Sequence, residues 1–198
     1  MKLYLNKTSP YARLALVVAH EKGLAEKIEL IWVDPWASPE ALLAVAPLAR
    51  VPVLVTNAGV AIPDSAAICD YLDIAGRGRA LVPPLPQREA VLGKYGLGRG
   101  IIELAFGATI EKRFHEGGKQ PLGERWLATV QRTAEHVERH SDVLGTGEPD
   151  LGDLCIMVGL SYTEFRLPQV QWRASCPKLA AWQDRMSGRA SMRATAPE

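Results

Sequence analysis

The sequence has no excess of charge of either sign. Its 23 Lys and Arg residues are balanced by 22 Asp and Glu residues, which leaves a net charge of +1 over 198 residues. Proteins that attract nucleic acids or acidic membrane surfaces from a distance carry a marked positive excess. The balance therefore argues against both kinds of partner and leaves small neutral or zwitterionic ligands open.

Long apolar runs are missing as well. The N-terminal stretch MKLYLNKTSP becomes polar at Asn6, so it lacks the apolar segment of a signal peptide. Nor does any run reach the roughly 20 apolar residues of a membrane-spanning helix. We expect a globular protein with neither a leader nor a membrane span.

Cysteine is scarce and scattered. The three cysteines, Cys69, Cys155 and Cys176, are odd in number and include no CxxC pair. Such a set favours reduced thiols in a cytoplasmic protein over a disulfide framework or a zinc site. Among the four histidines only His136 and His140 have a metal-like spacing, and without an HExxH pattern they indicate a solvated helix face. No metal site is expected.

The first 76 residues predict alternating short elements. Strands are predicted at Leu3–Leu5 and Ile28–Val33, and helices at Pro10–Lys22, at Pro39–Val45 and from Ser65 through Leu72. The order strand, helix, strand is typical of a βαβ unit. Further along, VPVLV and GVAIP flank the turn TNAG, in which Asn and Gly favour a tight hairpin. We expect an α/β domain over residues 1–76.

A breaker-rich stretch separates this half from the next. Residues 77–87 contain GRGR and VPPLP, which neither a helix nor a central strand tolerates, so they are predicted to be a linker. Residues 88–198 predict an all-helical domain, with helices at 88–116, 120–140, 150–165 and 177–188. The first of these helices carries five glycines, each costing about 1 kcal/mol against Ala, which indicates close helix packing or local irregularity.

The motif Ser9-Pro10 begins the first predicted helix. Serine is a favoured N-cap, and proline at the first helical position loses no needed hydrogen bond. A helix N-terminus also stabilises an anion. Ser9 is therefore either a plain cap or, if a ligand thiol lies there, a hydroxyl donor to its thiolate.

The motif Val51-Pro52 precedes the strand VLV. Proline cannot donate to a sheet ladder and belongs at a strand start, where a cis bond is tolerated. The backbone of Val51 is then available to bind an extended peptide. A plain proline between a loop and a strand is the alternative.

The motif Asp64-Ser65 starts the helix after the hairpin. Ser65 offers a hydroxyl and a backbone N–H to a ligand carboxylate, and Asp64 can pair with an ammonium. The alternative for Ser65 is a simple N-cap.

Taken together, these motifs make the chain resemble the glutathione S-transferases over essentially its whole length. The resemblance rests on TSPYARLALVVAHEKG, APLARVPVL, IPDSAAICDYLD and PDLGDLCIMVGLSYTEFRLP. It implies a thioredoxin-like N-terminal domain and a C-terminal helical bundle. In the last segment Asp150 replaces the usual Ser or Thr of the family's capping box, and since Asp accepts the same N–H bond we expect the cap to persist.

The resemblance also implies roles for individual residues. Ser9 matches the residue that contacts the glutathione sulfur. Val51 and Pro52 match the cis-proline motif, whose backbone pairs with the cysteinyl part of glutathione. Asp64 and Ser65 match the acidic-Ser pair that holds the γ-glutamyl ammonium and carboxylate. Two departures stand out: Ala49-Arg50 replaces Gly-Lys, and Asp64 replaces a longer Glu, which lengthens the reach to the ammonium.

The implied function is a cytoplasmic glutathione transferase, with glutathione as co-substrate and a homodimeric assembly. Because serine rather than cysteine stands at position 9, conjugation to a hydrophobic electrophile or reduction of a peroxide is favoured over thiol reduction. Tyr11, Ile102 and Phe106 are candidates for the electrophile pocket, although Tyr11 can equally pack and the other two can equally be bundle core. The rival interpretation is a non-catalytic module for glutathione binding or protein interaction on the same scaffold.

Overall fold

The computed structural model describes residues 1–115 and 121–197, which form two compact units. The first unit contains Met1–Leu81 together with Ala194–Glu198, and the second contains Val82–Arg193. The division falls inside the predicted linker, whereas the last few residues, predicted as part of the helical domain, group with the first unit. The predicted end of one helix at residue 116 and the predicted start of the next at residue 120 lie outside the described residues.

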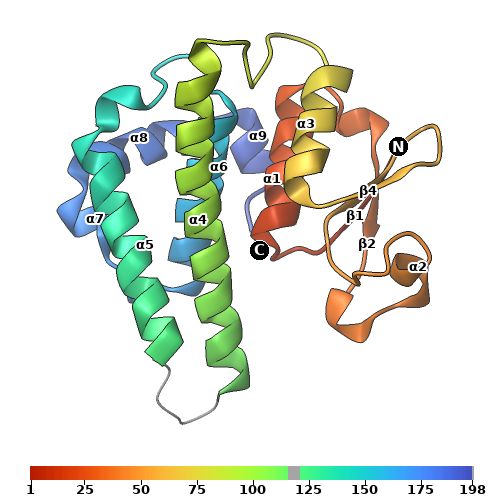
Figure 1. Ribbon diagram of the computed structural model, residues 1–198, viewed down its shortest axis with the longest axis horizontal. Helices are drawn as coiled ribbons and strands as arrows, with labels where there is room; N and C mark the ends of the chain where they lie inside the picture. The colour runs from red at the N-terminus through yellow and green to blue at the C-terminus, as the bar shows by residue number, and fades with distance from the viewer. Residues whose placement is uncertain (116–120, 198) are drawn as a thin grey trace. The chain divides into compact units, whose positions relative to one another are not determined.

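The first unit is built on a four-stranded mixed sheet with the order β2-β1-β3-β4 (Figure 1). The strands are β1 (Lys2–Leu5), β2 (Glu29–Trp32), β3 (Val53–Val55) and β4 (Ala61–Pro63). Strand β1 pairs with β2 in parallel, and β3 is antiparallel to both β1 and β4. The predicted βαβ unit and the hairpin are confirmed, and the arrangement is thioredoxin-like.

Alternating side chains give this sheet two apolar faces. Leu3 and Leu54 are opposite each other on one face and are fully buried, on the side of α1 (Pro10–Glu21) and α3 (Ser65–Ala75), which lie side by side (Figure 1). Val53 is on the other face and packs with Leu42 of α2 (Glu40–Leu43). Because successive residues of a strand point to opposite faces, four short strands suffice to support helices on both sides.

The second unit consists of helices joined by loops, with no strand among its described residues. Its helices are α4 (Gln87–Phe114), α5 (Pro121–Arg139), α6 (Leu151–Arg166), α7 (Trp172–Ser175), α8 (Pro177–Ser187) and most of α9 (Ala190–Ala194). The sequence predicts the four long helices but not α7 or α9, which are too short to show a helical period. Across the described part of the chain, no helix combines the length and apolar character needed to cross a membrane.

Glycines allow α4 and α6 to approach closely. A Cβ on Gly98 of α4 would lie 2.6 Å from the backbone of Cys155, and one on Gly159 of α6 would lie 2.9 Å from Ile101. Gly93, by contrast, faces open space. Close helix packing is thus the reason for Gly98, although it does not explain every glycine of α4.

The capping box at the start of α6 is present as expected. Oδ1 of Asp150 accepts the N–H of Asp153 at 3.0 Å, and Oδ2 of Asp153 accepts the N–H of Asp150 at 3.1 Å. Nearly all of α6 as far as Thr163 is buried. The box therefore satisfies backbone donors at the start of the most buried helix of the unit.

Candidate functional site

The register of the sheet aligns three strand ends. Tyr4 in β1 pairs with Val53 in β3, and Val53 pairs in turn with Pro63 in β4. Since β3 is antiparallel to both neighbours, the C-terminal ends of β1 and β4 lie beside the beginning of β3. The segments that follow β1 and β4 and the segment that precedes β3 therefore all lie at the same end of the sheet.

The three predicted motifs lie on these segments. Ser9 follows β1 after a short loop, Val51 and Pro52 come directly before β3, and Asp64 and Ser65 come directly after β4. The fold of the first unit thus brings together, at one end of the sheet, all the residues predicted to hold glutathione. This juxtaposition is the candidate functional site.

Ser9 is the N-cap of α1. Its backbone is extended (φ −77°, ψ 119°), Pro10 occupies the first helical position, and its Oγ accepts the N–H of Ala12 at 3.2 Å. Within the described residues its hydroxyl hydrogen has no acceptor. An acceptor role for the oxygen does not use the hydrogen, so capping the helix and donating to a ligand anion are compatible functions of one side chain.

Val51 presents an unused backbone next to the sheet. The Val51–Pro52 peptide bond is cis, and Pro52 is buried. Pairing with β1 and β4 begins only at Val53, and among the described residues neither the N–H nor the C=O of Val51 has a hydrogen-bond partner. One donor and one acceptor on the same residue match the backbone of an extended peptide.

Asp64, not Ser65, is the N-cap of α3. Its Oδ1 accepts the N–H of Ala66 at 2.7 Å, and Ser65 is the first helical residue, so the N-cap interpretation of Ser65 is wrong. Asp caps helices as well as Ser does, and the sequence Pro-Asp-Ser offers both in succession. Asp64 has a φ of +76°, an unfavourable value for a residue with a Cβ, and such backbone strain is frequent at ligand sites. The carboxylate of Asp64 is exposed, whereas Ser65 is almost fully buried.

The candidates for an electrophile pocket are distributed over both units. Tyr11 is half-buried on α1 in the first unit, and Phe106 is half-buried on α4 in the second. Ile102, also on α4, is fully buried. The full burial of Ile102 favours the alternative that it is a core residue.

None of the three protein thiols is an exposed nucleophile. Cys69, Cys155 and Cys176 are buried and form no disulfide bond. Burial raises the pKa of the Cys155 thiol, and to a smaller degree that of Cys176, so both are held neutral. In the described ranges no group of three or more His, Cys, Asp or Glu residues could hold a metal ion.

Comparison with known proteins identifies the family. Residues 8–75 match the family described as glutathione S-transferase, N-terminal domain. A solved glutathione transferase family member from Pseudomonas fluorescens Pf-5, with bound glutathione, is 30% identical in sequence and has a TM-score of 0.92. The match covers 100% of this chain and 98% of that chain. The chain belongs to the glutathione transferase family.

Further relatives agree with this assignment. The glutathione S-transferase from Methylobacillus flagellatus KT, solved with glutathione bound, is 30% identical with a TM-score of 0.90, covering 100% of this chain and 99% of that one. The uncharacterized GST-like protein YibF of Escherichia coli (strain K12) is 27% identical over 207 residues, covering 100% of this chain and 98% of that protein. The family and the fold predicted from the sequence are confirmed, and the roles of individual site residues stay predictions.

Proposed function

We propose that this protein is a glutathione transferase that binds glutathione as its thiolate and directs it at a hydrophobic electrophile or a peroxide. The observation that carries the proposal is the hydroxyl of Ser9, placed at the N-terminus of α1 with its oxygen engaged in the cap and its hydrogen available. The relatives solved with bound glutathione support the choice of ligand.

The remaining contacts follow from the groups around this end of the sheet. Val51 pairs through its N–H and C=O with the cysteinyl residue of glutathione, as a short addition to the sheet. Ser65, at the N-terminus of α3, receives the γ-glutamyl carboxylate, which the helix end favours. Asp64 uses one carboxylate oxygen for its cap at Ala66 and directs the other at the γ-glutamyl ammonium.

These groups suffice to ionise the bound thiol at neutral pH. A free thiol has a pKa of about 8.5, and lowering it by two units requires about 2.7 kcal/mol of preferential stabilisation of the thiolate. A helix N-terminus contributes about 0.3 to 2 kcal/mol, and a hydrogen bond to an anion about 1.5 to 3 kcal/mol. No general base is needed, and Ser9 acts as a neutral donor.

Two reactions are open to such a thiolate. In conjugation, the sulfur attacks the electrophilic carbon, an S–C bond forms, and the leaving group departs with its electron pair. In peroxide reduction, the sulfur attacks the terminal oxygen, an S–O bond forms as the O–O bond breaks, and the alkoxide leaves and takes a proton from water. The resulting sulfenic acid of glutathione then reacts with a second glutathione to give oxidised glutathione and water. Neither reaction needs a protein cysteine, which agrees with the burial of all three thiols. Cysteines that form no disulfide also fit a cytosolic protein.

Assembly as a homodimer is part of the proposal. Symmetric dimers are the commonest oligomers, and the family resemblance in sequence favours this state. Light scattering at micromolar concentration measures the mass directly. A monomer of 21.6 kDa at that concentration contradicts this part without affecting the catalytic proposal.

Calorimetric titration and an activity panel test the function. We expect the wild-type protein to bind glutathione and to turn over at least one member of a panel that includes 1-chloro-2,4-dinitrobenzene and cumene hydroperoxide. Ser65→Ala should weaken glutathione binding by about 1 to 3 kcal/mol, the scale of a lost charged hydrogen bond. Binding without any turnover establishes the rival, a non-catalytic glutathione-binding module, and absence of binding refutes both.

A further inference from the structure

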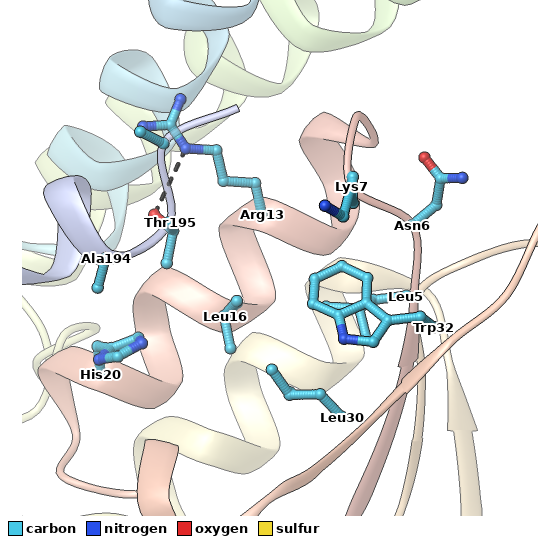
Figure 2. Close-up of a pocket in the computed structure, with 11 residues that line it drawn as sticks. Leu5, Asn6, Lys7, Arg13, Leu16, His20, Leu30, Trp32, Ala194 and Thr195 are labelled. Atoms are coloured by element: carbon cyan, nitrogen blue, oxygen red, sulfur yellow. Dashed lines mark hydrogen bonds between the residues drawn. The ribbon is translucent and has the colours of Figure 1, made fainter. Parts of the chain in front are cut away.

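Asn6 is the residue at which the chain leaves β1 for α1 (Figure 2). Only Asn6, Lys7 and Thr8 separate the end of the strand from Ser9, the N-cap of the helix. Ser9 can keep its hydroxyl directed at a bound thiolate only if this short connection holds one conformation. The hydrogen bonds of Asn6 supply that restraint.

The side chain of Asn6 is engaged at both of its polar atoms. Its Oδ1 accepts the backbone N–H of Thr8 and the hydroxyl of Thr8, each at 3.0 Å. Its Nδ2 donates to the C=O of Val33, the residue after β2, at 3.5 Å. An Asn side chain that accepts the N–H two residues further on forms an Asx turn, which takes the place of a backbone turn. Asn6 thus folds the connection through its side chain.

The backbone of Asn6 also holds the N-cap. Its C=O accepts the N–H of Ser9 at 3.4 Å, while Oγ of Ser9 accepts the N–H of Ala12 in α1. Val33, which accepts from the amide of Asn6, is itself bonded to the end of β1, since its N–H donates to the C=O of Leu5 at 3.0 Å. The connection that carries Ser9 is therefore fixed to the sheet on one side and to the helix on the other.

Two successive hydroxyl groups, those of Thr8 and Ser9, precede α1. A hydroxyl has a single hydrogen to donate, and that of Thr8 is used on Oδ1 of Asn6. The hydroxyl of Ser9 accepts from the helix, and within the described residues its hydrogen has no acceptor. Asn6 therefore determines which of the two hydroxyls is able to donate to an anion at the helix end.

We infer that Asn6 is a positioning residue for catalysis, which acts on the bound thiolate through Ser9 by holding the loop between β1 and α1 and by engaging the hydroxyl of Thr8. The inference rests on the proposed function, in which Ser9 donates to the thiolate of glutathione. Asn6 needs no contact with the ligand. Without its bonds Ser9 spends less time in the donating orientation, so the thiolate is less stabilised and the pKa of the thiol is higher.

The variant Asn6→Ala removes the three side-chain bonds and should raise the pKa of the bound glutathione thiol by about half a unit to one unit. Ultraviolet absorbance of the thiolate against pH measures this value in the complex. Turnover should fall below the thiol pKa and approach that of the wild type at higher pH. Affinity for S-methylglutathione, which has no ionisable thiol, should be unchanged. A merely structural role would lower turnover at every pH and leave the thiol pKa in place.

Two further variants control for the loss of an asparagine. Asn57 is an exposed asparagine in the turn between β3 and β4, at the other end of the sheet, so Asn57→Ala should leave the thiol pKa unchanged. Asn6→Ser retains a shorter acceptor that forms the same kind of turn more weakly, so its thiol pKa should lie between those of the wild type and Asn6→Ala. If Asn6→Ala does not fold, Asn6→Ser decides the matter, and a wild-type thiol pKa in that variant overturns the inference.

A double variant shows whether Asn6 acts through Ser9. In a Ser9→Ala background, Asn6→Ala should raise the thiol pKa no further, whereas two independent contributions would add. A full additional increase overturns the inference. A wild-type thiol pKa in Asn6→Ala, with a raised one in Ser9→Ala, also overturns it and leaves the proposed function standing. A wild-type thiol pKa in Ser9→Ala itself refutes the activation step of the proposed function, and this inference with it.

Discussion

Lys94 and Asp153 form a buried ion pair between α4 and the start of α6. The Nζ atom of Lys94 lies 2.7 Å from Oδ1 of Asp153, and the two side chains are only 6% and 1% exposed. The same Nζ lies 2.6 Å from Oδ2 of Asp150. The two carboxylates that cap the helix through each other's backbone N–H groups therefore also pair, through their other oxygens, with a lysine from a neighbouring helix, so the cap and the helix contact depend on the same two side chains.

Replacing Asp153 with Asn should lower the free energy of unfolding by about 1 to 3 kcal/mol, because Lys94 loses one of its two charged hydrogen bonds and keeps only Asp150 as a carboxylate partner. Urea titration followed by circular dichroism measures the change. Asp142→Asn is the control, since Asp142 is exposed and its replacement should have little effect. Equal stability of the Asp153 and Asp142 variants would show that the ion pair contributes nothing.

Two glycines of α4 should respond to alanine with opposite signs. Gly98→Ala places a Cβ 2.6 Å from the backbone of Cys155 and should destabilise by about 1 to 3 kcal/mol, the usual cost of overpacking. Gly93→Ala adds a Cβ with no atom within 4 Å and should stabilise by up to about 1 kcal/mol through helix propensity. Thermal unfolding of both variants measures the difference. If both changes stabilise the protein, the close approach of α4 to α6 is not what selects Gly98.

The sequence predicts elements well where the signal is local. The N-cap at Ser9 and the capping box that begins at Asp150 are both present, because each depends on residues within one helical turn. The lysine that pairs with the two carboxylates of the capping box is not predictable in the same way. Lys94 is 59 residues from Asp153, and a single lysine in a long helix ordinarily indicates solvent exposure.

The candidate site likewise depends on contacts between residues that are distant in sequence. Each of its motifs has a purely structural interpretation, and only the alignment of Tyr4, Val53 and Pro63 across the sheet brings the motifs to one end. Arg13 was not among the candidate site residues. Arg13 meets Thr195 across 182 residues, so no pattern along the chain indicates that contact.

Stability should fall at alkaline pH through Cys155. Burial raises the pKa of this thiol, whereas in the unfolded chain it ionises near pH 8.5. Above that pH the unfolded state binds fewer protons than the folded state, so the free energy of unfolding decreases by up to about 1.4 kcal/mol per pH unit for one thiol. Cys155→Ala removes this component. Urea titrations between about pH 8 and pH 10 should show a shallower decline for the variant, and parallel curves would contradict the assignment.

Ser9→Ala should separate binding of glutathione from its activation. Most of the proposed contacts lie at Val51, Asp64 and Ser65, so affinity is retained, while loss of the hydroxyl donor raises the pKa of the bound thiol by one unit or more. Turnover at neutral pH falls accordingly. Because Oγ of Ser9 also accepts the N–H of Ala12, the variant should lose about 1 kcal/mol of stability as well. Ultraviolet absorbance of the thiolate against pH measures the thiol pKa in the complex.

The control for this experiment is Ser9→Asp, which keeps the cap and removes the donor. Asp caps helices as well as Ser, so the stability lost in Ser9→Ala should be recovered. The carboxylate cannot donate when ionised and repels a neighbouring thiolate, so the thiol pKa should rise further than in Ser9→Ala. Stability and thiol pKa then change independently, which a capping role alone does not allow. Superimposable titration curves for wild type and Ser9→Ala would mean that Ser9 only caps α1 and that backbone N–H groups hold the anion.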